Sequence, residues 1–265
     1  MKKMKLDILT KQVVNLSRGV GKFITQEATK FSEKDIEVKG EHNFVSYVDK
    51  TAEKMLVQEL TKILPEAGFI AEENQSLQRA DRFNWIVDPL DGTTNFIHGV
   101  PPFSISIALT DSDETILGVV YEINLNEAFY AWKESSAYLN GTKIKVSNSP
   151  DIDSSLIATG FPYYDYSLLD PYLELFKDLM KSSHGVRRLG SAAVDLAYVA
   201  AGRYDIFYEY GLNPWDVAAG ALIVKQAGGH VTDFEGENDY LFGKKIIASN
   251  HKTHAEFLKK LKNYF

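Results

Sequence analysis

Four short segments rich in β-branched and aromatic residues follow one another in the middle of the chain, and they constrain the fold most strongly. They cover residues 83–87, 103–109, 115–121 and 128–132, separated by short stretches containing Asp, Ser and Asn. Asn140-Gly141 then gives a strong two-residue hairpin signal between residues 137–139 and 143–146. Strands linked in this way predict a mixed or largely antiparallel sheet.

Helical patterns flank the predicted sheet on both sides. Apolar residues recur at helical spacing over residues 6–29, 49–64, 172–180, 192–201, 217–227 and 254–262. Gly19 and Gly21 interrupt the first of these patterns, and such small residues allow close packing. We therefore expect layers of helices on both sides of the sheets.

Short strands predicted at residues 156–159, 206–210 and 246–249 alternate with the later helices, but not in strict β-α-β order. This pattern favours the α/β (α+β) class. The length of 265 residues suits a single domain spanning residues 1–265, or two closely joined halves. A modest change of composition near Ser149-Pro150 marks a candidate division into two subdomains.

Composition excludes several kinds of site and location. The chain contains no cysteine, which excludes disulfides, a thiolate nucleophile and any zinc or iron–sulfur site with sulfur ligands. The N-terminal lysines are not followed by the apolar core of a signal peptide, and no apolar run is long enough to span a membrane. We therefore expect a cytoplasmic protein with no membrane partner.

The net charge of −7 argues against nucleic acid as the main partner, because phosphate backbones are bound by basic patches. A phosphorylated small molecule remains compatible with this charge. An acidic site attracts phosphate when divalent metal ions lie between the two negative groups.

The stretch Asp88-Pro89-Leu90-Asp91 places two carboxylates around a bend that Pro89 is expected to form after a strand. Two close carboxylates need a cation, a proton or strong hydrogen-bond donors. A Mg²⁺ ion takes oxygen ligands, and the Leu90 carbonyl offers one more. Gly92-Thr93-Thr94 follows, and successive N–H groups at such a turn form a phosphate site. The alternative is an ordinary turn, in which Asp and Gly serve local needs.

Two further acidic positions are ambiguous when read alone. Glu72-Glu73 follows an apolar run over residues 68–71, and a solvated loop pair is the alternative to a metal-ligand pair. Asp216 precedes a predicted helix, where an N-cap is the alternative. His98 is interpreted as structural, since oxygen donors surround it in the sequence.

Read together, these motifs resemble a known family. Residues 85–96, Trp-Ile-Val-Asp-Pro-Leu-Asp-Gly-Thr-Thr-Asn-Phe, resemble the first signature of the inositol monophosphatase family of metal-dependent phosphatases. Residues 215–220, Trp-Asp-Val-Ala-Ala-Gly, followed by Ala227-Gly228-Gly229, resemble its second signature. Glu72-Glu73 matches the acidic pair of the family at the usual distance upstream. The resemblance spans most of the chain and implies a layered αβαβα sandwich of the inositol monophosphatase and fructose-1,6-bisphosphatase type.

The resemblance implies a site with two or three Mg²⁺ ions. By position in the motifs, Glu72, Asp88 and the Leu90 carbonyl would hold the first ion, and Asp88, Asp91 and Asp216 the second. A weaker third ion would bind near Glu72. In the family a metal-bound water attacks the phosphorus, and Asp88 would bridge the two ions.

The remaining site roles also follow from the resemblance. Glu72 and Thr93 would assist the water, and Asp49 would support Thr93. The N–H groups of Gly92 and Thr93 would bind phosphate oxygens. By the resemblance, the leaving group would contact Asp91, Gly190, Ser191, Ala192, Glu209 and Asp216. The resemblance further implies a homodimer and inhibition by Li⁺.

The sequence departs from the family pattern at several positions, and the short loop and Asn213-Pro214 bear on substrate choice. Asn43 stands where an Asp is common, in a loop over residues 39–49 that is slightly short, and Ala71 replaces a usual Gly. Asn213-Pro214 before Trp215 also differs from inositol-specific animal relatives. A short loop leaves room for a bulkier leaving group.

The sequence therefore favours a Mg²⁺-dependent phosphatase for inositol monophosphate. The closest alternative is a broad or dual-specificity relative acting on the 2′-phosphate of NADP(H), fructose 1,6-bisphosphate or adenosine 3′,5′-bisphosphate. An inactive phosphate sensor is disfavoured by the intact set of acids. A nucleotidyl transferase is disfavoured because neither G-x-x-x-x-G-K-[S/T] nor G-x-G-x-x-G occurs in a strand–helix context.

Overall fold

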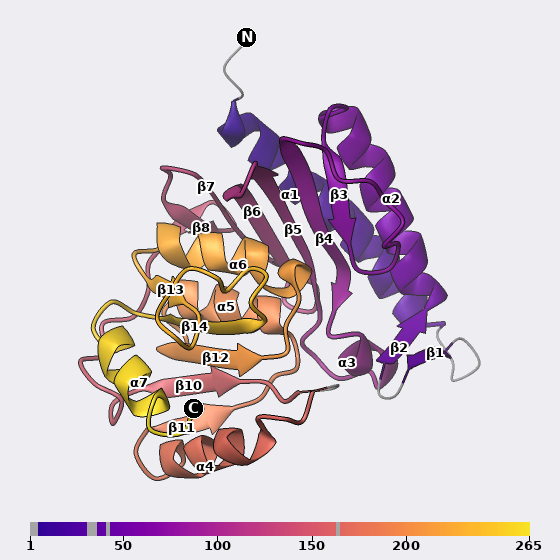
Figure 1. Ribbon diagram of the computed structural model, residues 1–265. Helices are drawn as coiled ribbons and strands as arrows, with labels where there is room; N and C mark the ends of the chain where they lie inside the picture. The colour runs from indigo at the N-terminus through magenta and orange to yellow at the C-terminus, as the bar shows by residue number, and fades with distance from the viewer. Residues whose placement is uncertain (1–4, 31–35, 41–42, 163–164) are drawn as a thin grey trace.

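Two β-sheets alternate with three layers of helices in the computed structural model of the chain (Figure 1). The structure describes residues 5–30, 36–40, 43–162 and 165–265. The layered αβαβα arrangement is the one that the sequence predicted. The loop over residues 39–49, expected to be short, contains residues 41 and 42, which lie outside the described part.

The larger sheet has seven strands in the order β3-β4-β5-β6-β7-β8-β9. All neighbours from β4 onward pair antiparallel, and β3 alone runs parallel to β4. The predicted hairpin at Asn140-Gly141 joins β8 to β9, and both residues have the positive φ (47° and 88°) that this turn requires. The strands are β3 (Gly68–Ala71), β4 (Phe83–Asp91), β5 (Ser104–Asp111), β6 (Glu114–Glu122), β7 (Glu127–Trp132), β8 (Ala137–Leu139) and β9 (Thr142–Ile144).

The smaller sheet has five strands in the order β11-β10-β12-β14-β13, with parallel pairing around β10 and antiparallel pairing around β14. Its strands are β10 (Leu156–Thr159), β11 (Gly185–Arg187), β12 (Ile206–Tyr210), β13 (His230–Thr232) and β14 (Lys245–Ser249). The chain passes from one sheet to the other between residues 144 and 156, around the candidate division near Ser149-Pro150. A separate pair, β1 (Ile36–Gly40) and β2 (Asn43–Ser46), is antiparallel.

The helices form the three remaining layers. Helices α1 and α2 cover the outer face of the larger sheet, α5 and α6 lie between the sheets, and α4 and α7 cover the smaller sheet (Figure 1). None of the helices in the described ranges has the length and apolar character needed to cross a membrane. They are α1 (Leu6–Ala28), α2 (Tyr47–Ile63), α3 (Thr93–Ile97), α4 (Leu169–Leu179), α5 (Ala192–Ala200), α6 (Pro214–Gln226) and α7 (His254–Leu261).

The central run Trp85–Val87 of strand β4 is apolar because both faces of the strand are buried there. Trp85 and Val87 belong to the core under α1 and α2, whereas Ile86 between them belongs to the core around α5 and α6. Successive side chains of a strand point to opposite faces, so one apolar run serves two cores. The site described below lies at the end of this strand.

Two sequence predictions about local structure were wrong. Pro89 does not turn the chain, because β4 continues through it to Asp91 with a shift of register against β5. The short strands β3, β11 and β13 were not predicted. Strands β11 and β13 have three residues with one apolar side chain each, and β3 is marked in the sequence only as an apolar run.

We predict opposite effects of alanine at the two glycines of α1. A Cβ at Gly21 would lie 2.4 Å from Cε1 of Tyr121 on β6, so the packing that the sequence suggested is real there. At Gly19 nothing lies within 4 Å. In chemical denaturation, Gly21→Ala should lower the free energy of unfolding by about 1–3 kcal/mol through overpacking. Gly19→Ala should raise it by about 0.5–1 kcal/mol. Equal effects of the two substitutions would contradict this packing.

Candidate metal centre and active site

A β-bulge at the end of β4 brings Asp88 and Asp91 to the same cavity. In a regular strand, residues three apart point to opposite faces. Here the pairing with β5 shifts register between the two aspartates, and both line the cavity. Asp88 is 2% exposed, and its Oδ1 accepts a hydrogen bond of 2.9 Å from the Leu90 N–H.

The third aspartate, Asp216, comes from the first turn of α6. The local sequence pattern favoured Asp216 as the N-cap of this helix, and that was wrong. Asn213 is the N-cap, and Asp216 occupies position N3, where the two residues form a capping box. Its Oδ2 accepts a hydrogen bond of 2.7 Å from the Asn213 N–H. The Ser106 hydroxyl donates to the Trp215 carbonyl at 2.9 Å and so fixes the start of α6 to β5.

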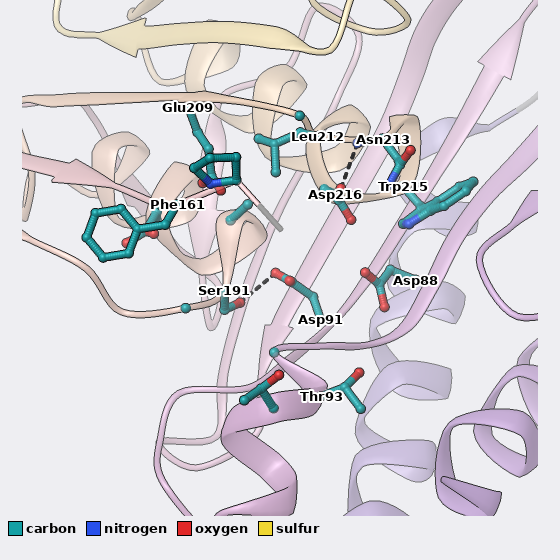
Figure 2. A pocket seen from close by; sticks show the side chains of 18 of the residues that line it. Asp88, Asp91, Thr93, Phe161, Ser191, Glu209, Leu212, Asn213, Trp215 and Asp216 are labelled. Atoms are coloured by element: carbon teal, nitrogen blue, oxygen red, sulfur yellow. Dashed lines mark hydrogen bonds between the residues drawn. The ribbon is translucent and has the colours of Figure 1, made fainter. Parts of the chain in front are cut away.

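These three aspartates each offer an oxygen to one cluster. The oxygens of Asp88, Asp91 and Asp216 all lie within 4.8 Å of one another, and Figure 2 shows the side chains converging from β4 and α6. Such a set of carboxylate oxygens is suited to a hard divalent cation such as Mg²⁺.

Glu72, directly after β3, lines the same cavity as the three aspartates. Parallel pairing of β3 with β4 continues to a hydrogen bond of 3.3 Å from the Glu72 N–H to the Val87 carbonyl, which places Glu72 next to Asp88. Both Glu72 and Asp88 line the cavity. The following Glu73 N–H donates to Glu53 of α2 at 2.8 Å, which holds this acidic loop in position.

The electrostatics of the cavity call for a cation. Burial, together with the neighbouring carboxylates, raises the pKa of Glu72 and of Asp88 well above the usual range. Burial also raises the pKa of Asp91 to about 6, against the opposing hydrogen bond from Ser191. Burial and then the charge of Asp91 raise the pKa of Asp216 to about 7. Ionised together, these groups repel one another strongly, and a bound divalent ion relieves that repulsion.

Thr93 and Asp49 form a second, buried part of the site. The Thr93 hydroxyl lies 3.0 Å from Oδ1 of Asp49 and 3.0 Å from the Leu90 carbonyl. Asp49 is fully buried in the first turn of α2, where its other oxygen accepts hydrogen bonds from the N–H and the hydroxyl of Ser46. Thr93 lines the cavity, and Asp49 lies behind it.

The turn before α3 presents donors to the cavity. Gly92 adopts a positive φ of 91° as the N-cap of this short helix. A Cβ there would lie 3.1 Å from the Pro102 carbonyl and 3.2 Å from the Gly190 carbonyl, so a side chain would crowd the turn. The N–H groups of Gly92 and Thr93 donate to none of the described residues. They are therefore available to an anion.

On the other side of the cavity, α5 begins at a turn made by Gly190, Ser191 and Ala192. The Ser191 hydroxyl donates to Oδ2 of Asp91 at 2.6 Å and also caps α5 by accepting from the Val194 N–H. Glu209 of β12 is 6% exposed, and burial raises its pKa well above the usual range. Figure 2 shows Glu209 and Asp88 on opposite sides of the space around Asp91.

The cavity measures about 140 Å³ and gathers nearly all of the residues that the sequence singled out. Each of the residues expected to bind metal or substrate lines it, and of the expected catalytic residues Asp49 alone does not. The set is Glu72, Asp88, Leu90, Asp91, Gly92, Thr93, Gly190, Ser191, Ala192, Glu209 and Asp216.

Three residues were missed by sequence reasoning. Arg188 and Asp195 line the cavity, and Asn95 donates hydrogen bonds of 2.8 Å to the carbonyls of Pro102 and Leu189. Asn95 thereby joins the loops that precede β5 and α5. It lies inside the first signature, which was the one available signal. Arg188 and Asp195 carry no local pattern that separates them from surface or helix residues.

Comparison with known proteins agrees with this site. The model of the inositol monophosphatase family matches residues 5–264. A relative from Neisseria meningitidis, named putative Nus factor SuhB, is 41% identical over 244 residues, covering 92% of this chain and 94% of the relative. An inositol-1-monophosphatase from Mesorhizobium japonicum is 37% identical over 251 residues, covering 94% of each chain.

Solved structures show the same fold. The extragenic suppressor protein SuhB from Bartonella henselae superimposes with a TM-score of 0.90 at 38% identity, covering 96% of this chain and 98% of that one. The IMPase from Thermotoga maritima gives a TM-score of 0.87, also at 38% identity, with 96% of each chain covered.

We predict that the metal-free protein loses stability as the pH rises. The pKa of Asp91 (about 6) and of Asp216 (about 7) in the folded protein exceed the value of about 3.9 for unfolded aspartate. The two protonated carboxyl groups contribute fully to the free energy of unfolding below about pH 4. This contribution is lost as the pH rises through the folded-state pKa values of about 6 and 7. In calorimetry with a chelator, the melting temperature should fall by roughly 5 °C between pH 5 and pH 8.

Added Mg²⁺ should raise the melting temperature more at pH 8 than at pH 5, because the carboxylates bind metal in their ionised form. Asp216→Asn serves as the comparison, since it removes one titrating group and should flatten the pH dependence. An unchanged slope in this variant would contradict the assignment.

Proposed function

Because the chain belongs to the inositol monophosphatase family, we propose that it hydrolyses myo-inositol 1-phosphate to inositol and phosphate with the help of Mg²⁺. The observation that supports this most directly is the cluster of Asp88, Asp91 and Asp216 in one cavity with Gly92 and Thr93, whose N–H groups donate to none of the residues that the structure describes. The metal ligands and the N–H groups that donate hydrogen bonds to phosphate then line the same small cavity. That combination suits metal-assisted hydrolysis of a phosphate ester.

The proposed metal ligands are the carboxylates of Glu72, Asp88, Asp91 and Asp216 and the carbonyl of Leu90, for two or three Mg²⁺ ions. When bound, such ions supply positive charge that polarises the phosphate and lowers the pKa of water. The N–H groups of Gly92 and Thr93 hold the phosphate oxygens in place for attack.

Thr93 and Asp49 orient the attacking water in this proposal. Asp49 is held by Ser46 and accepts a hydrogen bond from the Thr93 hydroxyl, so the Thr93 oxygen directs its lone pairs at a water in the cavity. Glu72 accepts the proton that the water loses. The raised pKa of Glu72, caused first by burial, makes this carboxylate a stronger base than an exposed one.

Asp91, Ser191 and Glu209 would meet the leaving alcohol. Ser191 and the Ala193 N–H fix Asp91 by hydrogen bonds of 2.6 and 2.8 Å, so its carboxylate is positioned before substrate binds. The alternative substrates keep the same chemistry and change this alcohol. They are the 2′-phosphate of NADP(H), fructose 1,6-bisphosphate and adenosine 3′,5′-bisphosphate.

We predict that Asp91→Asn lowers kcat for inositol 1-phosphate at least about 100-fold with Mg²⁺ present, because the cluster loses a charged ligand. Asp113→Asn in the exposed turn between β5 and β6 is the matched control and should keep the wild-type rate. Wild-type activity in Asp91→Asn would remove Asp91 from the metal site.

A substrate panel ranks the leaving groups. We predict that kcat/KM is highest for inositol 1-phosphate and lower for NADP⁺, fructose 1,6-bisphosphate and adenosine 3′,5′-bisphosphate, each assayed with Mg²⁺. A large preference for NADP⁺ would replace the first substrate by the alternative.

We extend the proposal to a cytoplasmic homodimer that Li⁺ inhibits. Sedimentation tests the dimer, and a Li⁺ titration of the same preparation tests the inhibition.

A second candidate function comes from the names of the relatives. The protein of Escherichia coli K12 named Nus factor SuhB is 40% identical over 241 residues, covering 91% of this chain. We propose that this chain can also act as a Nus factor in transcription complexes, through protein partners, since its net charge of −7 disfavours direct binding to nucleic acid.

We predict that the chain restores terminator readthrough in an Escherichia coli strain lacking its SuhB, as measured with a reporter gene. Asp91→Asn should restore it equally well if this function needs no catalysis. Restoration by neither protein would contradict the second function and leave the first untouched.

A further inference from the structure

Asp195 is a buried carboxyl group in the cavity to which neither the family signatures nor local patterns assign a role. It lies on α5, one turn after Ser191, and is 1% exposed. Its Oδ1 is buried and has no hydrogen-bond partner among the described residues. Asp195 nevertheless lines the same cavity as Asp91 and Glu209.

A structural role does not account for this side chain. Two other buried aspartates hold the backbone in place: Asp205 accepts from Ser147 and the Leu156 N–H, and Asp233 accepts from three N–H groups of the following loop. Asp195 accepts no such bond from the described residues, and α5 is already capped by Ser191. A buried carboxyl oxygen without a partner costs stability, so a ligand that supplies the missing donor is the expected reason for it.

The surroundings of Asp195 define what that ligand can be. Asp195 and Glu209 line the same cavity, and burial, and next the charge of Glu209, raise the pKa of Asp195 well above the usual range. Arg188 opposes this shift and is the sole basic residue among the described residues that line the cavity. At this end of the cavity two carboxyl groups therefore face one cation.

Such a pair suits hydroxyl groups better than a second phosphate. A carboxyl group accepts a hydrogen bond from a hydroxyl when ionised and can also donate one when protonated. A second phosphate would place further negative charge against Glu209 and Asp195, which a single Arg188 cannot balance.

We propose that Asp195 is a specificity-determining residue that hydrogen-bonds a hydroxyl of the leaving alcohol next to Glu209. This end of the cavity then selects a neutral alcohol with neighbouring hydroxyls over one that carries a second phosphate. The inference rests on the proposed phosphatase function and names the substrate class of the same site.

Two substrates with different leaving groups test the proposal. In Asp195→Ala, KM for inositol 1-phosphate should rise about tenfold or more, the effect of one lost hydrogen bond to a charged or buried group. The kcat/KM for 4-nitrophenyl phosphate, whose leaving group has no neighbouring hydroxyls, should stay within about twofold of wild type. Asp195→Asn keeps the shape of the side chain, and its KM for inositol 1-phosphate should lie between those of the wild type and of Asp195→Ala.

Stability gives an independent readout. Removing a buried group that has no partner should leave the melting temperature of Asp195→Ala unchanged or higher. Asp205→Ala, which removes an aspartate with partners, is the matched control and should lower it. A lower melting temperature for Asp195→Ala, with parallel loss of activity on both substrates, would overturn the proposal in favour of a structural role.

Deoxy analogues of inositol 1-phosphate identify the contact without depending on any one variant. In the wild type, removing the hydroxyl that meets Asp195 should lower kcat/KM about tenfold, whereas Asp195→Ala should no longer distinguish that analogue from the parent. Equal discrimination in the two proteins overturns the proposal. If the wild type hydrolyses 4-nitrophenyl phosphate but no analogue series shows discrimination, the specificity inference alone fails. If it hydrolyses neither substrate, the proposed function fails and the inference fails with it.

Discussion

Mutual repulsion among the carboxyl groups of one cavity is the constraint around which this structure is organised. Glu72, Asp88, Asp91 and Asp216 are drawn from three elements into a region where burial strengthens every charge–charge interaction. Local donors restrain three of them: the Leu90 N–H binds Asp88, Ser191 binds Asp91 and the Asn213 N–H binds Asp216. Each of the three aspartates still offers one oxygen to the shared cluster.

The layered fold makes that arrangement rigid. Helix α6 lies between the two sheets, and the Ser106 hydroxyl binds its first turn to β5, so Asp216 is fixed relative to β4 (Figure 1). On the opposite face, α2 places Asp49 behind Thr93. Positions on packed strands and helices hold a site more accurately than loops do. The acids thus stay close although their repulsion favours separation.

Much of the fold could be predicted because its patterns are local. The strands at Leu156–Thr159 and Ile206–Tyr210 have the bounds that the sequence indicated, since dense apolar runs between turn residues leave few alternatives. The strands β11 and β13 escaped prediction because each has three residues with a single apolar side chain, and β3 was noted only as an apolar run. Pro89 escaped for a different reason: a proline bends a free chain, but the neighbouring strand β5 holds this one extended through a bulge.

The sequence by itself indicated an all-oxygen donor set for the site once its motifs were read together as a family resemblance, whereas the stretch from Asp88 to Thr94 alone also fitted an ordinary turn. The grouping of Glu72 and Asp216 with Asp88 was predicted through that resemblance alone, because these residues lie far apart along the chain and only packing brings them to one cavity. The role that we propose for Asp195 comes from the tertiary structure alone, because in sequence Asp195 is one polar residue in a helix. Its meaning depends on burial, on the neighbouring Glu209 and on an oxygen without a partner, and these are properties of packed side chains.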